Sequence, residues 1–84
     1  MKDIYEQARE LTATTRQAQY GAPEDNLGRI AALWSVYVGK PLNAHDVAVM
    51  MALVKIGRIA SGVTVPDNYV DAVAYMGLAD RLRP

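Results

Sequence analysis

The sequence predicts an all-α fold, a compact domain of four helices that includes residues 1 to 84. Apolar residues recur every three or four positions in four stretches of the chain, and glycine or proline separates these stretches. No stretch has the alternation of polar and apolar residues that is typical of a half-buried strand. The connections have about three to five residues each, so consecutive helices are expected to lie as antiparallel neighbours.

The first helix is predicted to begin after Asp3. Asp3 and Glu6 have the spacing of a capping box, in which the Asp accepts backbone N–H groups and the Glu reaches back to the cap. Apolar residues follow at helical spacing, at Ile4, Ala8, Leu11 and Ala18. Threonine lowers helix propensity, so we expect this helix to be the least stable of the four. Its threonines are Thr12, Thr14 and Thr15.

The second helix is predicted between Gly21 and Gly39. Gly21 is suited to the left-handed backbone conformation that ends a helix, so we predict a positive φ at this residue. Pro23 suits the first turn of the helix that follows, and Gly39 with Pro41 closes it. The apolar stripe consists of Leu27, Ile30, Ala31, Trp34 and Val38. Its tryptophan is therefore expected in the core or in an interface.

The third helix, about residues 43–61, is the most apolar and is expected to be central in the domain. Asn43 and Asp46 have the spacing of an Asx-type cap at its start. On a helical wheel its only interior charges, Lys55 and Arg58, lie on one side, and most of the remaining circumference is apolar.

The apolar surface of this helix must be buried against other helices. A helix of an isolated four-helix bundle presents roughly a third to half of its circumference to the core, so a homo-oligomer is the simplest arrangement that buries the rest. Ala48, Ala52 and Gly57 are small enough to allow the close approach of another helix. The alternative is that the long first helix folds over the central one.

The last helix is predicted to extend to about Leu82. Thr64 and Asp67 repeat the capping spacing, and Pro66 lies within the first turn.

Composition limits the classes of function. Nine basic and nine acidic residues give a net charge of zero, which disfavours nucleic-acid binding through phosphate contacts. The chain has no cysteine and one histidine, so disulfides are excluded and a structural zinc site is nearly excluded. The longest apolar run, residues 47–54, is far shorter than the roughly 20 residues that cross a bilayer. With no apolar signal segment at the N-terminus, a soluble intracellular domain is expected.

A cluster of charged residues is the main candidate site. Asp67 and Asp71 are one turn apart on the last helix, and Tyr75 follows on the next turn. Because the last two helices are consecutive and antiparallel, Arg58 is expected to meet Asp67 or Asp71. The cluster is either an ion-pair network that fixes helix register or a ligand site. As a ligand site, its carboxylates would hold Mg²⁺ and Lys55 or Arg58 would contact a phosphate.

The segment from Tyr20 to Glu24 is a second candidate. A tyrosine in this position often packs over the helix end, and the acidic Glu24 and Asp25 argue against anion binding at the helix start. His45 is interpreted as a solvated helix-start residue rather than a catalytic base. The sequence has no nucleophile–base pair, Gly-rich phosphate loop or metal-ligand spacing, so no catalytic or metal-binding residues are predicted.

Three stretches of the chain resemble a known family. They are QYGAPEDNLGRIAALW at 19–34, NAHDVAVMMALVKIGRIASG at 43–62 and DNYVDAVAYMGL at 67–78. In order and spacing they resemble three blocks of short phage and prophage proteins of unknown function: YG-x-PE-x-N-x-x-x-IA-x-LW, DVA-x-MM-x-L-x-K-x-x-R and D-x-x-x-D-x-x-x-Y. Ala22 stands where this family often has Asp. The matching motif positions are Tyr20, Gly21, Pro23, Glu24, Asn26, Trp34, Asp46, Lys55, Arg58, Asp67, Asp71 and Tyr75.

The same family is distantly similar to phage nucleotide-modification-associated domains and to the MazG-type all-α nucleoside triphosphate pyrophosphatases. The MazG likeness implies Mg²⁺ as a cofactor, held by an E-x-x-E or E-x-x-D pair on one helix and an E-x-x-D pair on the next. In this chain Glu24 and Asp25 are adjacent, and Asp67 and Asp71 are four positions apart. Neither helix therefore carries the full MazG pattern.

These likenesses imply a phage accessory protein of the host-cell cytoplasm that binds a nucleotide or nucleotide-derived ligand without clear catalytic machinery. The expected ligand-binding residues are Tyr20, Lys55, Arg58, Asp67, Asp71 and Tyr75. Two alternatives are a protein-interaction module directed at a host factor and a Mg²⁺-dependent MazG-like pyrophosphohydrolase. The expected partners are copies of the same chain and either a nucleotide or a host protein, with no membrane or nucleic acid. No cofactor is expected, apart from Mg²⁺ in the MazG-like case.

Overall fold

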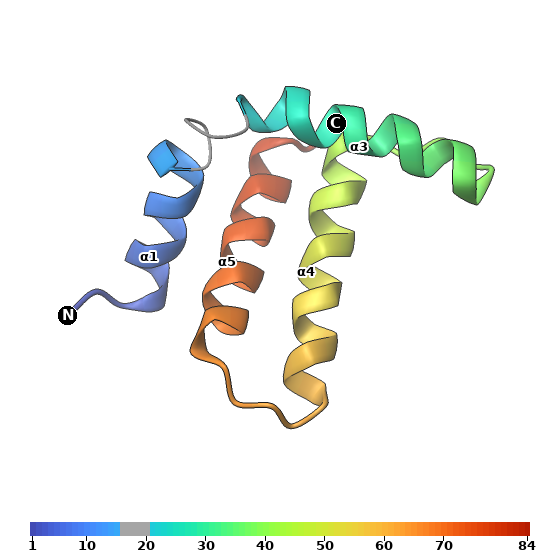
Figure 1. Cartoon of the computed structure of the whole chain (residues 1–84). Helices are drawn as coiled ribbons and strands as arrows, with labels where there is room; N and C mark the ends of the chain where they lie inside the picture. The colour runs from blue at the N-terminus through green and yellow to red at the C-terminus, as the bar shows by residue number, and fades with distance from the viewer. Residues whose placement is uncertain (16–20) are drawn as a thin grey trace.

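A computed structural model describes residues 1–15 and 21–84, and its regular structure is helical throughout. The first helix consists of α1 (Ile4–Glu10) and a π-helical segment, η1 (Leu11–Thr15). The others are α3 (Pro23–Val38), α4 (Ala44–Ala60) and α5 (Pro66–Arg81) (Figure 1). The predicted all-α fold of four helices is confirmed, and the described part of the chain contains no strand.

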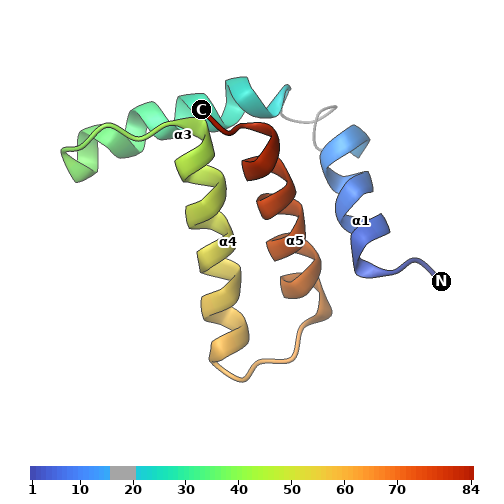
Figure 2. The same ribbon diagram turned by 180° about the vertical axis from the view of Figure 1, so that it is seen from behind.

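The helices do not form the simple up-and-down bundle that short connections predict. α4 and α5 lie side by side and antiparallel, as expected, but α3 lies across the ends of both (Figures 1 and 2). α1 lies along the other side of α5 and runs in the same direction as α5 (Figures 1 and 2). Small residues explain the crossing, because Ala31, Ala48 and Ala79 are nearly fully buried where α3, α4 and α5 meet. They allow α3 to approach the two helix ends closely.

The core is small and rich in alanine. One cluster joins α3, α4 and α5, and its buried members are Leu27, Ala31, Val47, Ala48 and Ala79. A second cluster joins α1 to α5 and consists of Ala8, Val70 and Ala74. Trp34, which was predicted in the core or in an interface, is partly buried and packs against the first cluster.

Helix starts follow the predicted caps at two of three places. Asn43 accepts a hydrogen bond from the Asp46 backbone N–H at 2.9 Å, and the Asp46 carboxylate accepts one from the Asn43 N–H at 3.0 Å. Asp3 accepts a hydrogen bond from the Glu6 N–H at 2.8 Å, but the predicted return bond from the Glu6 side chain to the cap is absent among the described residues. The predicted cap by Thr64 and Asp67 is wrong. Pro66 is the first residue of α5, so the N-cap position falls on Val65, whose side chain accepts no capping hydrogen bond. Asp67 is exposed in the first turn.

The connection before α3 contains a glycine in left-handed geometry. Gly21 has φ +83°, which confirms the predicted positive φ, and Pro23 is the first residue of α3. The predicted end of the first helix at this glycine falls on residues 16–20, outside the described residues.

Replacement of Gly21 by alanine is expected to lower the free energy of unfolding by about 1 kcal/mol, because a Cβ atom disfavours positive φ. Gly28 is the matched control. It lies inside α3, nothing lies within 4 Å of a Cβ added there, and Gly28→Ala should stabilise by about 0.5–1 kcal/mol. Urea denaturation of both variants measures the two effects. Equal changes for both variants would contradict the backbone argument.

The apolar circumference of α4 is only partly covered. α1 packs on α5, so the alternative in which the first helix folds over the central one is wrong. Ala48 and Ala52 are buried inside the domain and are not available to a second copy, contrary to expectation. On the outward side Leu53 and Ile56 are 58% and 49% exposed. Among the residues described, no helix is both long and apolar enough to cross a membrane.

Candidate functional site

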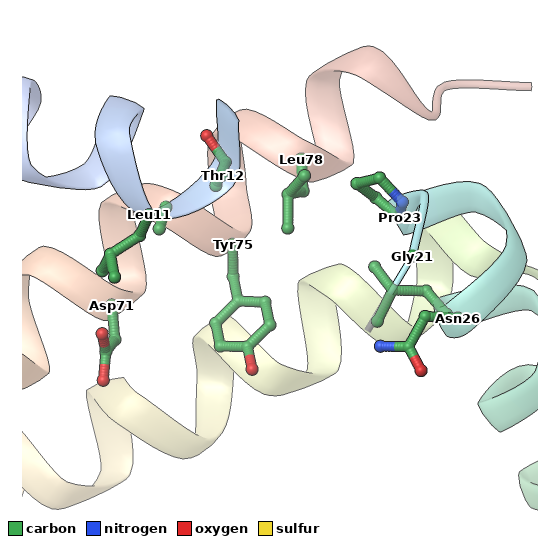
Figure 3. A pocket seen from close by; sticks show the side chains of 10 residues that line it. Leu11, Thr12, Gly21, Pro23, Asn26, Asp71, Tyr75 and Leu78 are labelled. Atoms are coloured by element: carbon green, nitrogen blue, oxygen red, sulfur yellow. The ribbon is translucent and has the colours of Figure 1, made fainter. Parts of the chain in front are cut away.

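A small cavity lies where η1, the start of α3 and the middle of α5 meet (Figure 3). Its volume is about 70 Å³. It exists because α3 crosses the end of α5 while α1 and η1 run along the side of α5. The lining residues are Leu11, Thr12, Gly21, Pro23, Asn26, Leu27, Asp71, Ala74, Tyr75 and Leu78. We call this cavity the Tyr75 pocket.

Three side chains give the Tyr75 pocket its polar character. The ring of Tyr75 lies between the carboxylate of Asp71 and the amide of Asn26 in the view of Figure 3. All three side chains are partly buried. The hydroxyl of Thr12 is engaged elsewhere, because it donates to backbone carbonyls of α1, those of Ala8 and Arg9, at 3.2 and 3.1 Å. The pocket thus offers an aromatic face, an amide with both donor and acceptor atoms, and a carboxylate.

Asp71 is held by an ion pair from α4. Its Oδ2 atom lies 3.2 Å from Nζ of Lys55, and the two side chains are 21% and 14% exposed. Lys55 follows the buried Ala48 and Ala52 by seven and three positions, so it projects from the inner side of α4. Burial of both partners makes this pair more than a surface contact.

Of the four charged residues predicted to form a cluster, only Lys55 and Asp71 form an ion pair within the described part of the chain. Arg58 was expected to meet Asp67 or Asp71, but Arg58 is exposed and forms no ion pair with any residue that the structure describes. Arg58 lies three positions after Lys55, and that rotation moves it away from the inner side of the helix. Asp67 is likewise exposed. Of the predicted ligand-binding residues, Asp71 and Tyr75 line the pocket and Lys55 reaches it through Asp71.

Two other predicted positions lie elsewhere. Tyr20 lies outside the described residues, although the adjacent Gly21 lines the pocket. His45 is partly exposed at the start of α4, with its Nδ1 atom 3.8 Å from the Asp46 carboxylate.

Several pocket residues were missed from the sequence. Asn26 belongs to the first of the three blocks that resemble the phage family, and this could have marked it as a candidate site residue. Leu78 lies on the same face of the last helix as Asp71 and Tyr75, and that spacing was its signal. Leu11 and Thr12 gave no signal for the pocket, because their place in it depends on how α1 packs on α5.

Basic side chains line a second, more open cavity of about 330 Å³ between α1 and α5. Its lining residues include Arg9 from α1 and Arg81 from α5, both exposed, and Tyr5. The Tyr75 pocket itself has no lysine or arginine among its described lining residues. Within the described part of the chain, no group of three or more histidine, cysteine, aspartate or glutamate side chains is arranged to hold a metal ion.

Comparison with known proteins relates nearly the whole chain to phage sequences. A family described as "Domain of unknown function (DUF6378)" matches residues 3–83. The chain is 35% identical over 81 residues to the Gene 55 protein of Mycobacterium phage D29. It is 36% identical over 77 residues to the Gene 55 protein of Mycobacterium phage L5. These matches cover 96% and 90% of this chain but 54% and 49% of the relatives, so the chain spans about half their length. No solved structure matches the chain.

Proposed function

We propose that this chain, which belongs to the DUF6378 family, is a phage accessory protein that binds a nucleoside or the nucleoside part of a nucleotide in the Tyr75 pocket. The observation that carries the proposal is the meeting of separate sequence blocks at one cavity. Gly21, Pro23 and Asn26 come from the first block, and Asp71 and Tyr75 come from the third. Lys55, from the second block, contacts the Asp71 carboxylate.

The chemistry of the pocket fits a nucleobase and its sugar. The ring of Tyr75 is a stacking surface, and base–aromatic stacking contributes about 1–3 kcal/mol per base. The Asn26 amide has the donor and acceptor atoms that recognise the edge of a base. Asp71 supplies an acceptor for a sugar hydroxyl or an amino group.

Pocket size and charge define the part of the ligand that is recognised. A cavity of roughly 150 Å³ holds a benzene ring, and the Tyr75 pocket measures about 70 Å³. One edge of a base would therefore enter the pocket while the rest of the ring lies over Tyr75. Phosphates would extend outside, because the described lining residues include no cation to pair with them.

In this proposal the chain binds its ligand without hydrolysing it, in contrast to the MazG-like alternative. That alternative needs Asp67 and Asp71 to act together on Mg²⁺. The two carboxylates have different surroundings, since Asp71 is ion-paired with Lys55 and Asp67 is exposed in the first turn of α5.

Titration calorimetry with adenosine, guanosine, cytidine and thymidine tests the proposal. At least one nucleoside should bind, and Tyr75→Ala should weaken its binding about tenfold, because the stacking surface is lost. Tyr75→Phe keeps the ring and should retain most of the affinity. Tyr69→Ala is the matched control, since Tyr69 is an exposed residue of α5 that does not line the pocket, and its affinity should equal that of the wild type.

Asn26→Asp gives a second readout at the same pocket. The substitution replaces an amide that donates and accepts by a carboxylate that only accepts, so the preference among the four bases should change. No binding by any nucleoside, or equal binding by the wild type and Tyr75→Ala, would contradict the proposed function.

A further inference from the structure

The open cavity lies between two helices that are side by side and run in the same direction, α1 and α5 (Figures 1 and 2). Its lining residues on α5, at positions 73, 77 and 81, are four apart and share one side of that helix. Its volume of about 330 Å³ is within the range of small-molecule pockets. The open cavity is therefore large enough to hold a ligand.

Small residues keep the open cavity unfilled. Ala8 and Ala74 belong to its lining and are buried, so they form its inner part. Gly77 lies within α5 without positive φ, and a Cβ atom added there would meet nothing within 4 Å. Glycine is a poorer helix former than alanine, and neither backbone geometry nor a close neighbour among the described residues requires it here. What its missing side chain provides is room in the cavity.

The charge of the open cavity is positive. Arg9 and Arg81 line it, and none of its described lining residues is acidic. Neither arginine forms an ion pair with a residue that the structure describes. The five residues outside the described part, 16–20, include no aspartate or glutamate. Two guanidinium groups thus line one cavity in a chain whose net charge is zero.

Other cations engage the acidic residues that are adjacent to these arginines in the sequence. Glu10 follows the first arginine, and its carboxylate lies 2.6 Å from Nζ of Lys2. Asp80 precedes the second, and its carboxylate lies 3.0 Å from Nε of Arg83. The local acids therefore stabilise other basic side chains and leave the two guanidinium groups to the cavity.

The helix dipole explains only one of the two arginines. A cation in the last turn of a helix is stabilised by the helix dipole, and Arg81 has this position in α5. Arg9 is near the end of α1, but the Leu11 N–H donates to carbonyls of α1 and the chain continues into η1. Arg9 is therefore not at a free helix end, and its position needs another reason.

We propose that the open cavity binds the phosphate monoester of a small organic molecule. A phosphate monoester has about 1.5 to 2 negative charges at pH 7 and three terminal oxygen atoms. Each guanidinium is a planar fork that can bind two oxygen atoms, so a phosphate can accept from Arg9 and Arg81 together. A carboxylate has one charge and two oxygen atoms, and a single arginine would already engage both.

The volume of the cavity leaves room for the organic part of the ligand. A cavity of roughly 150 Å³ holds a benzene ring, so about 330 Å³ accommodates a group of that size beside a phosphate. Tyr5 supplies an aromatic ring in the lining. This inference does not rest on the proposed function, because Asn26, Asp71 and Tyr75 are not among the described lining residues of the open cavity.

Nuclear magnetic resonance titration of the ¹⁵N-labelled chain with phenyl phosphate tests this inference. The Nε–Hε signals of Arg9 and Arg81 should shift together with one Kd. Arg9→Gln and Arg81→Gln should each weaken binding about tenfold or more, because each removes a charge-assisted contact. Arg58→Gln is the matched control, since Arg58 is exposed on α4 outside the cavity, and its affinity should equal that of the wild type. Benzoate and phenol should bind at least about tenfold more weakly than phenyl phosphate.

Gly77→Met tests the cavity without removing a charge. The methionine would occupy the space beside α5 and should weaken binding of phenyl phosphate about tenfold or more. Its Tm should equal or exceed that of the wild type, because methionine is the better helix former. Gly57→Met, at an exposed glycine of α4, should leave binding unchanged.

Three results would overturn the inference. The first is the absence of arginine shifts at about 10 mM phenyl phosphate, which is ten times a millimolar Kd. The second is wild-type affinity in Arg9→Gln, Arg81→Gln or a folded Gly77→Met chain. The third is equal binding of benzoate or phenol, which would show that the phosphate is not what the cavity recognises.

Discussion

Ala52→Glu is expected to unfold the domain or to lower its Tm by about 15–30 °C. Ala52 is 1% exposed on the inner side of α4, one turn after the fully buried Ala48. A glutamate there would bury a carboxylate without a partner, which costs several kcal/mol. A domain of this size has roughly 4–13 kcal/mol of total stability, so a large share would be lost.

Ala32→Glu is the matched control for this prediction. Ala32 is exposed within α3, and a glutamate there should change the free energy of unfolding by less than about 0.5 kcal/mol. Thermal melts followed by circular dichroism compare the two variants. A wild-type Tm for Ala52→Glu would show that the inner side of α4 does not face the core. Because Ala52 is inside the domain, this variant reports on folding.

Loss of the Lys55 charge is expected to have the second largest effect on stability. Lys55→Met removes the partner of a carboxylate that is 21% exposed and should lower the free energy of unfolding by about 1.5–3 kcal/mol. The double variant Lys55→Met with Asp71→Leu removes both charges, and its stability should be within about 1 kcal/mol of the wild type. Urea denaturation measures all three chains.

Arg58→Met tests whether Lys55 pairs with Asp71, as in the structure, or whether Arg58 does, as the sequence predicted. Arg58 is exposed and forms no ion pair within the described part of the chain, so its replacement should change stability by less than about 0.5 kcal/mol. If Arg58→Met were the destabilising variant and Lys55→Met the neutral one, the ion pair with Asp71 would be assigned to the wrong residue.

The helix boundaries could be predicted because their signals are local. Asn43 and Asp46 are three positions apart and cap each other, and the predicted helix from about 43 to 61 corresponds to α4. Gly21 has the predicted positive φ and Pro23 begins α3. The Thr64 cap was wrong because two local signals competed, and the proline at the first helical position determined the start of α5.

The arrangement of the helices could not be predicted in the same way. A helical wheel placed Lys55 and Arg58 on one side of α4, but which of them faces α5 depends on the rotation of the packed helix. Likewise, small size suggested that Ala48 and Ala52 would admit a second copy, whereas α3 and α5 already cover that side. Sequence periodicity gives an apolar face but not the neighbour that covers it.

The candidate site was predicted in part for the same reason. Asp71 and Tyr75 lie one turn apart on a single helix, so their common face could be read from the sequence. Leu11 and Asn26 come from other elements, and they join the pocket only because α1 packs along α5 and α3 crosses its end.

Nucleoside binding at the Tyr75 pocket is the central claim, and nuclear magnetic resonance titration of the ¹⁵N-labelled chain tests it most directly. Addition of the nucleosides one at a time should shift the side-chain amide signal of Asn26 and the backbone signals of Leu11, Tyr75 and Leu78 together, with one common Kd. Signals of the open cavity, at Arg9 and Arg81, should stay in place. Shifts confined to those arginines, or no shifts with any nucleoside, would contradict the claim.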